Sequence, residues 1–149
     1  MKTAIYPGSF NPWHQGHRDI MHKAEQIFDH IVIAQGFNPE KYEEGQVKEE
    51  LRKITGIYSC KITHIVFTGF LTELIKSLNR QGDYTIDAVI RGLRNGNDLQ
   101  YEQNQQYWYE DLGLQIPIAY FITHRDLGHI SSSAIRAIDK ISKGKSWIV

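Results

Sequence analysis

Short apolar segments alternate along the chain with segments of helical periodicity. Five of the apolar segments are rich in Ile and Val, and most show little alternation with polar residues: Thr3–Tyr6, His30–Gln35, Lys61–Phe67, Ile86–Ile90 and Ile116–Phe121. Continuous apolar runs of this length are typical of strands that are covered on both faces. The pattern therefore predicts five strands of a parallel sheet.

The segments between these strands carry apolar residues at helical spacing. Two stripes are clear, one at Ile20, Met21, Ala24, Ile27 and Phe28 and the other at Leu71, Leu74, Ile75 and Leu78. We also predict helices over 98–111 and 46–55, and a last helix just after Ser131–Ser133 with Ala134, Ile135, Ile138 and Ile141 facing inward. The fold class is therefore α/β, a Rossmann-like doubly wound sheet of about five parallel strands with helices on both faces.

Function is expected at one rim of this sheet. Ligands of doubly wound sheets bind at the carboxyl ends of the strands, where the strand order reverses. The loops that meet there are 7–17, 36–45, 67–70, 91–98 and 122–133. The 149 residues show no repeat or long linker, so residues 1–149 are expected to form a single domain.

The first rim loop combines glycines with two histidines at the start of a helix. Gly8 and Gly16 permit close backbone approach, and the helix N-terminus offers unpaired N–H groups to an anion. His14 and His17 are three residues apart, so both can face the same phosphate. Taken alone, such a pair is more often structural, and a zinc site would need a third ligand at a recognisable spacing.

Other rim segments carry groups suited to phosphate. Arg91 and Arg94 follow the fourth predicted strand, and guanidinium groups make bidentate contacts with phosphate oxygens. The hydroxyls of Ser131–Ser133 can cap the last helix and receive phosphates at the same time. Lys41 lies in the loop after the second strand. Taken alone, Glu102 is an exposed residue that favours the helix dipole.

Composition excludes several classes of protein. Seventeen Lys and Arg balance seventeen Asp and Glu, which argues against a nucleic-acid partner. No run approaches the roughly 18 apolar residues that span a bilayer, so no membrane partner is expected. Cys60 is the only cysteine, which rules out an intrachain disulfide and a cysteine-based zinc site. We expect a cytoplasmic protein.

Two segments resemble the signatures of the nucleotidylyltransferase superfamily. Gly8–Pro12 with His14–His17 resembles its H-x-G-H signature, and Ile130–Arg136 resembles its second signature, a serine-rich turn that leads into a helix. These two alone leave several acceptor substrates open.

A third block narrows the resemblance. Arg91–Arg94, followed by Asp98, Tyr101 and Glu102, is similar to the corresponding block of the phosphopantetheine adenylyltransferase family, and Asn38-Pro39-x-Lys41 agrees. The resemblance implies transfer of the adenylyl group of ATP to 4′-phosphopantetheine with Mg²⁺, which gives dephospho-coenzyme A and pyrophosphate. It also implies a homo-oligomer, since the family forms hexamers.

By position, the resemblance implies three sets of site residues. The catalytic set is His17, which stabilises charge on the α-phosphate, with Lys41 and Arg94. The ATP contacts are Ser9, Phe10, His14, His17, Gly92, Leu93, Arg94, Glu102, Leu127, Gly128, His129, Ile130, Ser131, Ser132 and Ser133. The substrate contacts are Ser9, Lys41, Leu71 and Arg91. No carboxylate pair is evident for a metal, so the expected ligands of Mg²⁺ are ATP phosphates and water.

Three alternatives stay open. A nicotinamide or nicotinate mononucleotide adenylyltransferase would use His14–His17 and Ser131–Arg136 equally well. A cytidylyltransferase is separable by testing CTP. A catalytically silent nucleotide-binding module is suggested by departures from the family pattern over Tyr42–Leu51, where the usual second lysine after Lys41 is a tyrosine.

Overall fold

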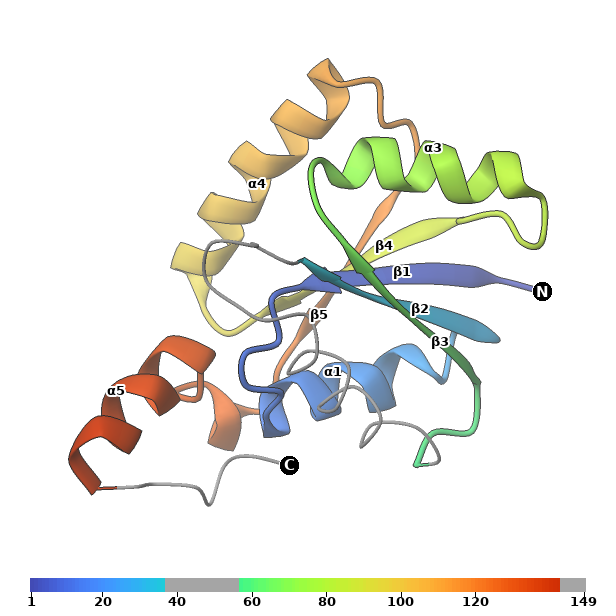
Figure 1. Ribbon diagram of the computed structural model, residues 1–149. Helices are drawn as coiled ribbons and strands as arrows, with labels where there is room; N and C mark the ends of the chain where they lie inside the picture. Colours follow the sequence, from blue (N-terminus) through green and yellow to red (C-terminus); the bar gives the residue numbers. More distant parts are fainter. Residues whose placement is uncertain (37–56, 143–149) are drawn as a thin grey trace.

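The computed structural model describes residues 1–36 and 57–142 (Figure 1). Its strands are β1 (Thr3–Gly8), β2 (His30–Gly36), β3 (Lys61–Phe67), β4 (Ala88–Leu93) and β5 (Ile118–Ile122). They form one parallel sheet in the order β3-β2-β1-β4-β5. The order reverses between β1 and β4, which is the switch point of a doubly wound sheet. The predicted fold class is confirmed.

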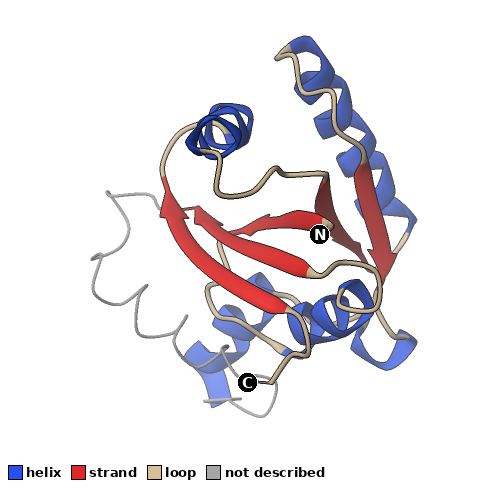
Figure 2. Ribbon diagram, turned by 90° about the vertical axis from the view of Figure 1, so that its right-hand side faces the viewer, coloured by secondary structure: helices blue, strands red, loops and turns tan. Residues whose placement is uncertain are grey.

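Helices cover both faces of this sheet. They are α1 (Gln15–Ala24), α3 (Leu71–Gln81), α4 (Gly96–Asp111) and α5 (Ser132–Ser142), with a short 3₁₀ turn over Arg125–Leu127. Figures 1 and 2 show α3 and α4 on one face and α1 and α5 on the other. None of the helices within residues 1–36 and 57–142 has the length and apolar character needed to cross a membrane.

Alternate residues of the central strands supply two separate cores. Ala4 and Tyr6 of β1 pack in one cluster with Ile20 of α1. Ile5, between them, packs in a second cluster with Ile75 of α3. Because successive side chains of a strand point to opposite faces, burial on both faces requires apolar residues at consecutive positions. This explains the continuous apolar runs that predicted the strands.

The fourth strand extends further than its apolar run. The sequence places its end at Ile90, but β4 continues through Leu93 because Arg91, Gly92 and Leu93 pair in register with β5. The same happens at β1, which runs to Gly8 alongside β2. Arg91 was predicted to lie in the rim loop 91–98, but it belongs to the strand, and its backbone is fixed by the sheet.

The predicted helices need three corrections. Ile27 was expected on the inward stripe, but α1 ends at Ala24 and the Ile27 side chain is 53% exposed. The last helix begins at Ser132, inside the serine run, because Ser131 provides its first cap. Ile138 is 36% exposed and does not face inward as expected. The predicted helix over 46–55 and the side chain of Ile141 lie outside what the structure describes.

Candidate active site

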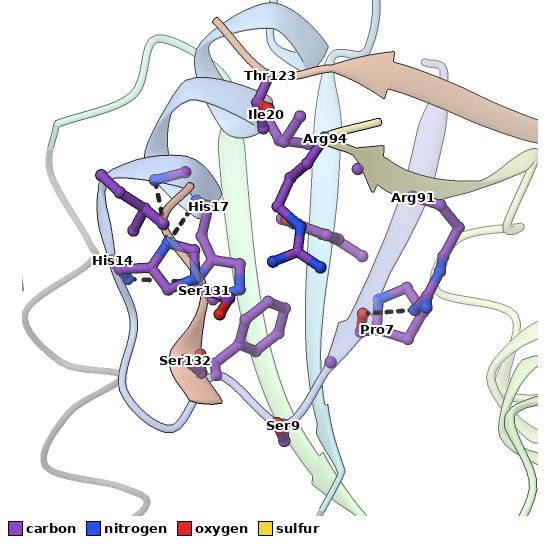
Figure 3. A pocket seen from close by; sticks show the side chains of 16 residues that line it. Pro7, Ser9, His14, His17, Ile20, Arg91, Arg94, Thr123, Ser131 and Ser132 are labelled. Atoms are coloured by element: carbon purple, nitrogen blue, oxygen red, sulfur yellow. Dashed lines mark hydrogen bonds between the residues drawn. The ribbon is translucent and has the colours of Figure 1, made fainter. Parts of the chain in front are cut away.

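A cleft of about 260 Å³ opens at the carboxyl ends of β1 and β4, at the switch point of the sheet (Figure 3). It is lined from four directions: the loop after β1, the first turn of α1, the end of β4, and the start of α5. The lining residues are Tyr6–Phe10, His14, Gly16, His17, Ile20, Arg91, Gly92, Arg94, Thr123 and Ile130–Ser132. The rim predicted to carry function is therefore the rim that carries the cleft.

His14 and His17 form the N-terminal cap of α1. The Nδ1 atom of His14 accepts from the backbone N–H groups of Gly16 at 3.0 Å and His17 at 3.4 Å. In return, the Nδ1 atom of His17 accepts from the backbone N–H of His14 at 3.2 Å. This is a capping box in which imidazole replaces the usual hydroxyl and carboxylate. A structural role and a place in the cleft therefore coincide in the same two side chains.

The cap fixes the protonation state of both rings. A ring nitrogen that accepts an N–H carries no proton, so each neutral ring holds its proton on Nε2. Burial and, less strongly, the charge of Arg94 lower the pKa of His14 to about 4. Burial, with a smaller contribution from His14, holds the pKa of His17 well below its ordinary value. The cleft thus contains two neutral imidazoles, stacked at 3.7 Å, each with one Nε2–H donor.

The loop after β1 packs its aromatic rings around His17. The ring of Phe10 meets the imidazole of His17 edge-on, with centroids 4.9 Å apart, and Trp13 lies 5.1 Å from it. Phe10 has a φ of 47°, and its ring covers Gly8, where a Cβ would lie 2.8 Å from the ring. Gly8 is therefore required because the Phe10 ring occupies the space of a side chain.

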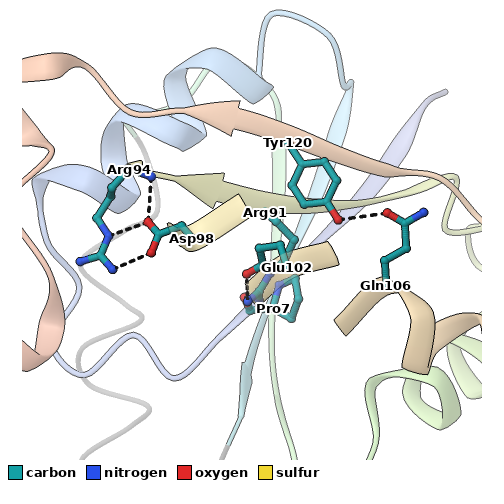
Figure 4. Close-up of polar contacts among 7 residues, drawn as sticks. All are labelled: Pro7, Arg91, Arg94, Asp98, Glu102, Gln106 and Tyr120. Carbon is teal, nitrogen blue, oxygen red and sulfur yellow. Dashed lines mark hydrogen bonds and ion pairs between the residues drawn. The ribbon is translucent and has the colours of Figure 1, made fainter. Parts of the chain in front are cut away.

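Two arginines reach the cleft from the end of β4, and each has a carboxylate partner (Figure 4). Glu102 of α4 binds the Arg91 guanidinium at two points, 2.7 and 3.0 Å. Asp98 accepts from the Arg94 side chain at 2.9 and 3.0 Å. Burial would lower the pKa of Arg91, but the bonds and charge of Glu102 outweigh it and raise this pKa. The bond to Arg94 lowers the pKa of Asp98.

Glu102 is not the exposed residue that its position in the helix suggests. It is the one buried residue of α4, at 6% exposure, and it lies outside the lining of the cleft. Its carboxylate stands behind Arg91, which also donates to the Pro7 carbonyl at 3.3 Å. Glu102 therefore holds Arg91 against the edge of the cleft.

The serines at the start of α5 have separate tasks. The hydroxyl of Ser131 accepts from the Ala134 N–H and caps the helix. The hydroxyl of Ser132 donates to the Pro12 carbonyl, which ties α5 to the loop after β1. Ser133 accepts from Arg136 and does not line the cleft. Ser131 and Ser132 lie in the cleft, so the run supplies both a cap and a wall.

The structure brings together most, but not all, of the predicted site residues. Lining the cleft are Ser9, Phe10, His14, His17, Arg91, Gly92, Arg94, Ile130, Ser131 and Ser132. Outside the lining are Leu71, Leu93, Glu102, Leu127, Gly128, His129 and Ser133. The side chains of Leu71 and Leu93 are buried, each at 7% exposure, and Leu71 belongs to the core on the α3 face. Lys41 lies outside the described residues.

The predicted site residues omit six residues of the lining: Tyr6, Pro7, Gly8, Gly16, Ile20 and Thr123. Pro7, Gly8 and Gly16 lie in the first predicted rim loop. Tyr6 and Ile20 were assigned only to a strand and a helical stripe, yet the alternation that turns Tyr6 toward α1 could have placed it under the cleft. Burial raises the pKa of Tyr6, which keeps its hydroxyl neutral. Thr123 donates to the Leu93 carbonyl at the ends of β4 and β5. It lies in the predicted rim loop 122–133, but its residue type does not distinguish it from its neighbours there.

The described residues do not build a resident magnesium site. No group of three His, Cys, Asp or Glu side chains within 1–36 and 57–142 is arranged as metal ligands. The two carboxylates that follow the Arg91–Arg94 segment in the first two turns of α4, Asp98 and Glu102, are both bound to arginines. Mg²⁺ requires oxygen ligands, so the donor set here does not fit a dedicated ion.

Comparison with known proteins assigns the family. Residues 5–138 match the family described as cytidylyltransferase-like. The chain is 36% identical to the phosphopantetheine adenylyltransferase of Cytophaga hutchinsonii, over 93% of this chain and 90% of that protein. It is 34% identical to the phosphopantetheine adenylyltransferase of Mycoplasma mycoides, over 96% of this chain and 100% of that protein. The chain belongs to the phosphopantetheine adenylyltransferase family.

Membership of this family confirms the resemblance carried by the three motifs. A solved structure of a Vibrio parahaemolyticus protein, provisionally named a nicotinate-nucleotide adenylyltransferase, is similar to the whole fold. The TM-score is 0.61, with 15% identity, over 94% of this chain and 82% of that one. At this identity the likeness supports the α/β architecture and does not distinguish between acceptor substrates.

Proposed function

We propose that this phosphopantetheine adenylyltransferase family member transfers the adenylyl group of ATP to 4′-phosphopantetheine, which gives dephospho-coenzyme A and pyrophosphate. The observation that carries the proposal is the cleft at the switch point. This cleft brings the neutral His14–His17 pair together with Arg91, Arg94 and the α5 serines, in a chain that belongs to this family. These are donors suited to phosphate oxygens, in the place where such sheets bind nucleotides.

The reaction proceeds by direct attack, without a covalent enzyme intermediate. A phosphate oxygen of phosphopantetheine forms a bond to the α-phosphorus of ATP, and the bond from that phosphorus to the oxygen bridging to the β-phosphate breaks. Pyrophosphate leaves with the bonding electrons. A phosphate monoester has a second pKa near 6, so the attacking phosphate is mostly a dianion at pH 7. The enzyme therefore needs no strong base, and catalysis rests on in-line positioning and charge stabilisation.

Each side of the cleft has a task in this scheme. The Nε2–H groups of His14 and His17 donate to the α-phosphate, where negative charge develops. The guanidinium of Arg94 offsets negative charge on the triphosphate of ATP. Ser9 and Arg91 hold the phosphate of the acceptor, with Arg91 fixed by its buried ion pair. We propose that Lys41, as the resemblance implies, supplies a further positive charge to the reacting phosphates.

The remaining predicted contacts complete the scheme as proposals. The segment Leu127–Ser133 contacts the nucleotide, with Ile130, Ser131 and Ser132 in the cleft itself. Glu102 acts on the acceptor side through Arg91, and Leu71 serves that same side. Mg²⁺ enters as part of the Mg–ATP substrate, coordinated by phosphate oxygens and water. The basis of this proposal is the preference of Mg²⁺ for phosphate oxygens and water as ligands when it binds with a nucleotide.

Two further proposals concern location and assembly. We propose that the protein works in the cytoplasm, because its single cysteine, Cys60, fits a reducing compartment. We propose that it assembles as a homo-oligomer, because α4 exposes large apolar side chains, among them Tyr101 at 60% and Trp108 at 64%. Light scattering coupled to size-exclusion chromatography tests the assembly, and a monomeric mass at micromolar concentration would reject it.

Pyrophosphate release from Mg–ATP tests the function. The acceptors 4′-phosphopantetheine, nicotinamide mononucleotide and nicotinate mononucleotide are offered separately, and CTP replaces ATP in a parallel set. We expect turnover with ATP and phosphopantetheine alone. Turnover with a mononucleotide would overturn the acceptor assignment, and turnover with CTP would overturn the donor assignment. ATP binding without pyrophosphate release for any acceptor would identify a silent nucleotide-binding module.

A further inference from the structure

Gln35 is a polar residue that follows the apolar segment Ile31–Ala34 of β2, and it does not line the cleft. It lies near the end of β2, is 3% exposed, and follows Ile31 and Ile33, which belong to the core on the α1 face. Because side chains alternate along a strand, Gln35 points to that same face. Its backbone pairs with Gly8, the last residue of β1.

The Gln35 side chain replaces a sheet bond that β1 can no longer make. After Gly8 the chain leaves the sheet, and the carbonyl of Ser9 accepts from Nε2 of Gln35 at 2.7 Å. A carbonyl oxygen only accepts, so the bonded amide atom is the nitrogen. The loop after β1 is thus anchored at its first residue by a buried side chain from the neighbouring strand.

This anchor has a cost that an aliphatic residue would avoid. The Oε1 atom of Gln35 is buried and has no hydrogen-bond partner among the residues that the structure describes. Ser9 is exposed, so its carbonyl could accept from water if Gln35 were absent. For stability alone, a methionine of the same length would serve as well or better. The amide is therefore better explained by what it holds in place.

The anchored loop leads directly to His17. Phe10, the residue after Ser9, has the left-handed φ of 47°, a conformation that a non-glycine residue adopts only when its surroundings impose it. Its ring is edge-on to the His17 imidazole at 4.9 Å. A shift of the Ser9 carbonyl therefore moves Phe10, and a shift of Phe10 removes one wall of the His17 ring.

We propose that Gln35 is a positioning residue for adenylyl transfer: its amide holds the Ser9 carbonyl, and through Phe10 this fixes the orientation of the His17 ring. The inference rests on the proposed function, because it assigns Gln35 a part in the same reaction. Gln35 itself touches neither substrate.

The test compares Gln35→Met with Ile31→Val. The first variant removes the amide and keeps the length of the side chain. The second removes a methylene from a fully buried residue on the same face of β2, four positions before Gln35. For each variant we measure kcat and KM for both substrates, the midpoint of thermal unfolding, and the ring signals of His17 in ¹⁵N-histidine spectra. The His17 signals are assigned by their absence in His17→Asn.

We expect Gln35→Met to lower kcat about tenfold, since small displacements of a catalytic group reduce rates by this order or more. Its unfolding midpoint is unchanged or higher, and its His17 ring signals shift or broaden. Ile31→Val leaves kcat and the His17 signals as in the wild type.

The proposal is overturned if Gln35→Met keeps kcat within twofold of wild type, or if kcat falls only together with the unfolding midpoint. Should the wild-type protein form no dephospho-coenzyme A, the proposed function fails, and the ring signals decide the inference separately. Unchanged His17 signals in Gln35→Met would then reject it.

Discussion

The strongest test of the site is the replacement of His17 by residues that each keep one half of its imidazole. Nδ1 of His17 accepts from the backbone N–H of His14 and caps α1, whereas Nε2–H is the donor proposed for the α-phosphate. The amide oxygen of an asparagine overlays Nδ1, so His17→Asn keeps the cap and loses the catalytic donor. The amide nitrogen of a glutamine overlays Nε2, so His17→Gln keeps a donor and loses the cap.

The magnitudes follow from the two kinds of bond. Loss of a donor to developing negative charge costs about 10²–10³ in kcat, or roughly 2.7–4 kcal/mol. Loss of one cap bond lowers the free energy of unfolding by about 1 kcal/mol. We therefore expect His17→Asn and His17→Ala to lower kcat by about 10²–10³, with a smaller effect on KM. Only His17→Ala and His17→Gln lose the stability of the cap.

Steady-state formation of dephospho-coenzyme A gives kcat for each variant, and urea unfolding gives stability. A tenfold or smaller loss of kcat in His17→Asn would refute the donor role. The pH profile supplies a second check on the same residue. Because burial holds the pKa of His17 well below its ordinary value, the ring is neutral and kcat stays level from pH 7 to pH 9. A fall in kcat as the pH rises, with a midpoint near pH 6.5, would indicate a catalytic imidazolium instead.

Three further predictions concern the frame of the site. Glu102→Ala leaves Arg91 without its buried partner, so the free energy of unfolding in urea should fall by about 3 kcal/mol, and a loss below about 1 kcal/mol would contradict the buried pair. The lowered pKa values of His14 and His17 mean that the unfolded chain binds protons first as pH falls. Stability present above about pH 6.5 is then lost toward pH 4, by at most about 1.4 kcal/mol per pH unit for each histidine, and equal stability at pH 7 and pH 5 would contradict this. Gly16→Ala places a Cβ 2.9 Å from Cε1 of His14, so the melting temperature should fall although alanine favours helices, and a rise would show that the cap tolerates the methyl group.

Much of the fold follows from the sequence because the sheet is covered on both faces. Burial on both sides of β1 and β2 forces continuous apolar runs, which a single sequence displays directly. The end of β4 is different. Arg91 and Gly92 pair with β5, but neither residue is typical of a strand interior, so the apolar run stops before the strand does.

The site was predictable as far as its chemistry stands in the primary structure. Histidines at a helix start and serines at another mark the phosphate side, and both groups lie in the cleft. Residues that act through a contact with a distant segment of the chain showed no such signal in the sequence. Glu102 is buried on a helix whose exposed side carries aromatic residues, which reverses the usual pattern, and only the tertiary structure shows that Arg91 accounts for it. The bond from Gln35 to the Ser9 carbonyl is equally invisible before the strands are aligned.

The reverse reaction offers the most direct test of the central claim. Adenylyl transfer from ATP with release of pyrophosphate is reversible, so dephospho-coenzyme A and magnesium pyrophosphate should regenerate ATP, which luciferase detects. The account predicts ATP from dephospho-coenzyme A and none from NAD or its deamido form, with the signal lost in His17→Asn. Formation of ATP from NAD or its deamido form would contradict the account, and so would a failure to form ATP from dephospho-coenzyme A.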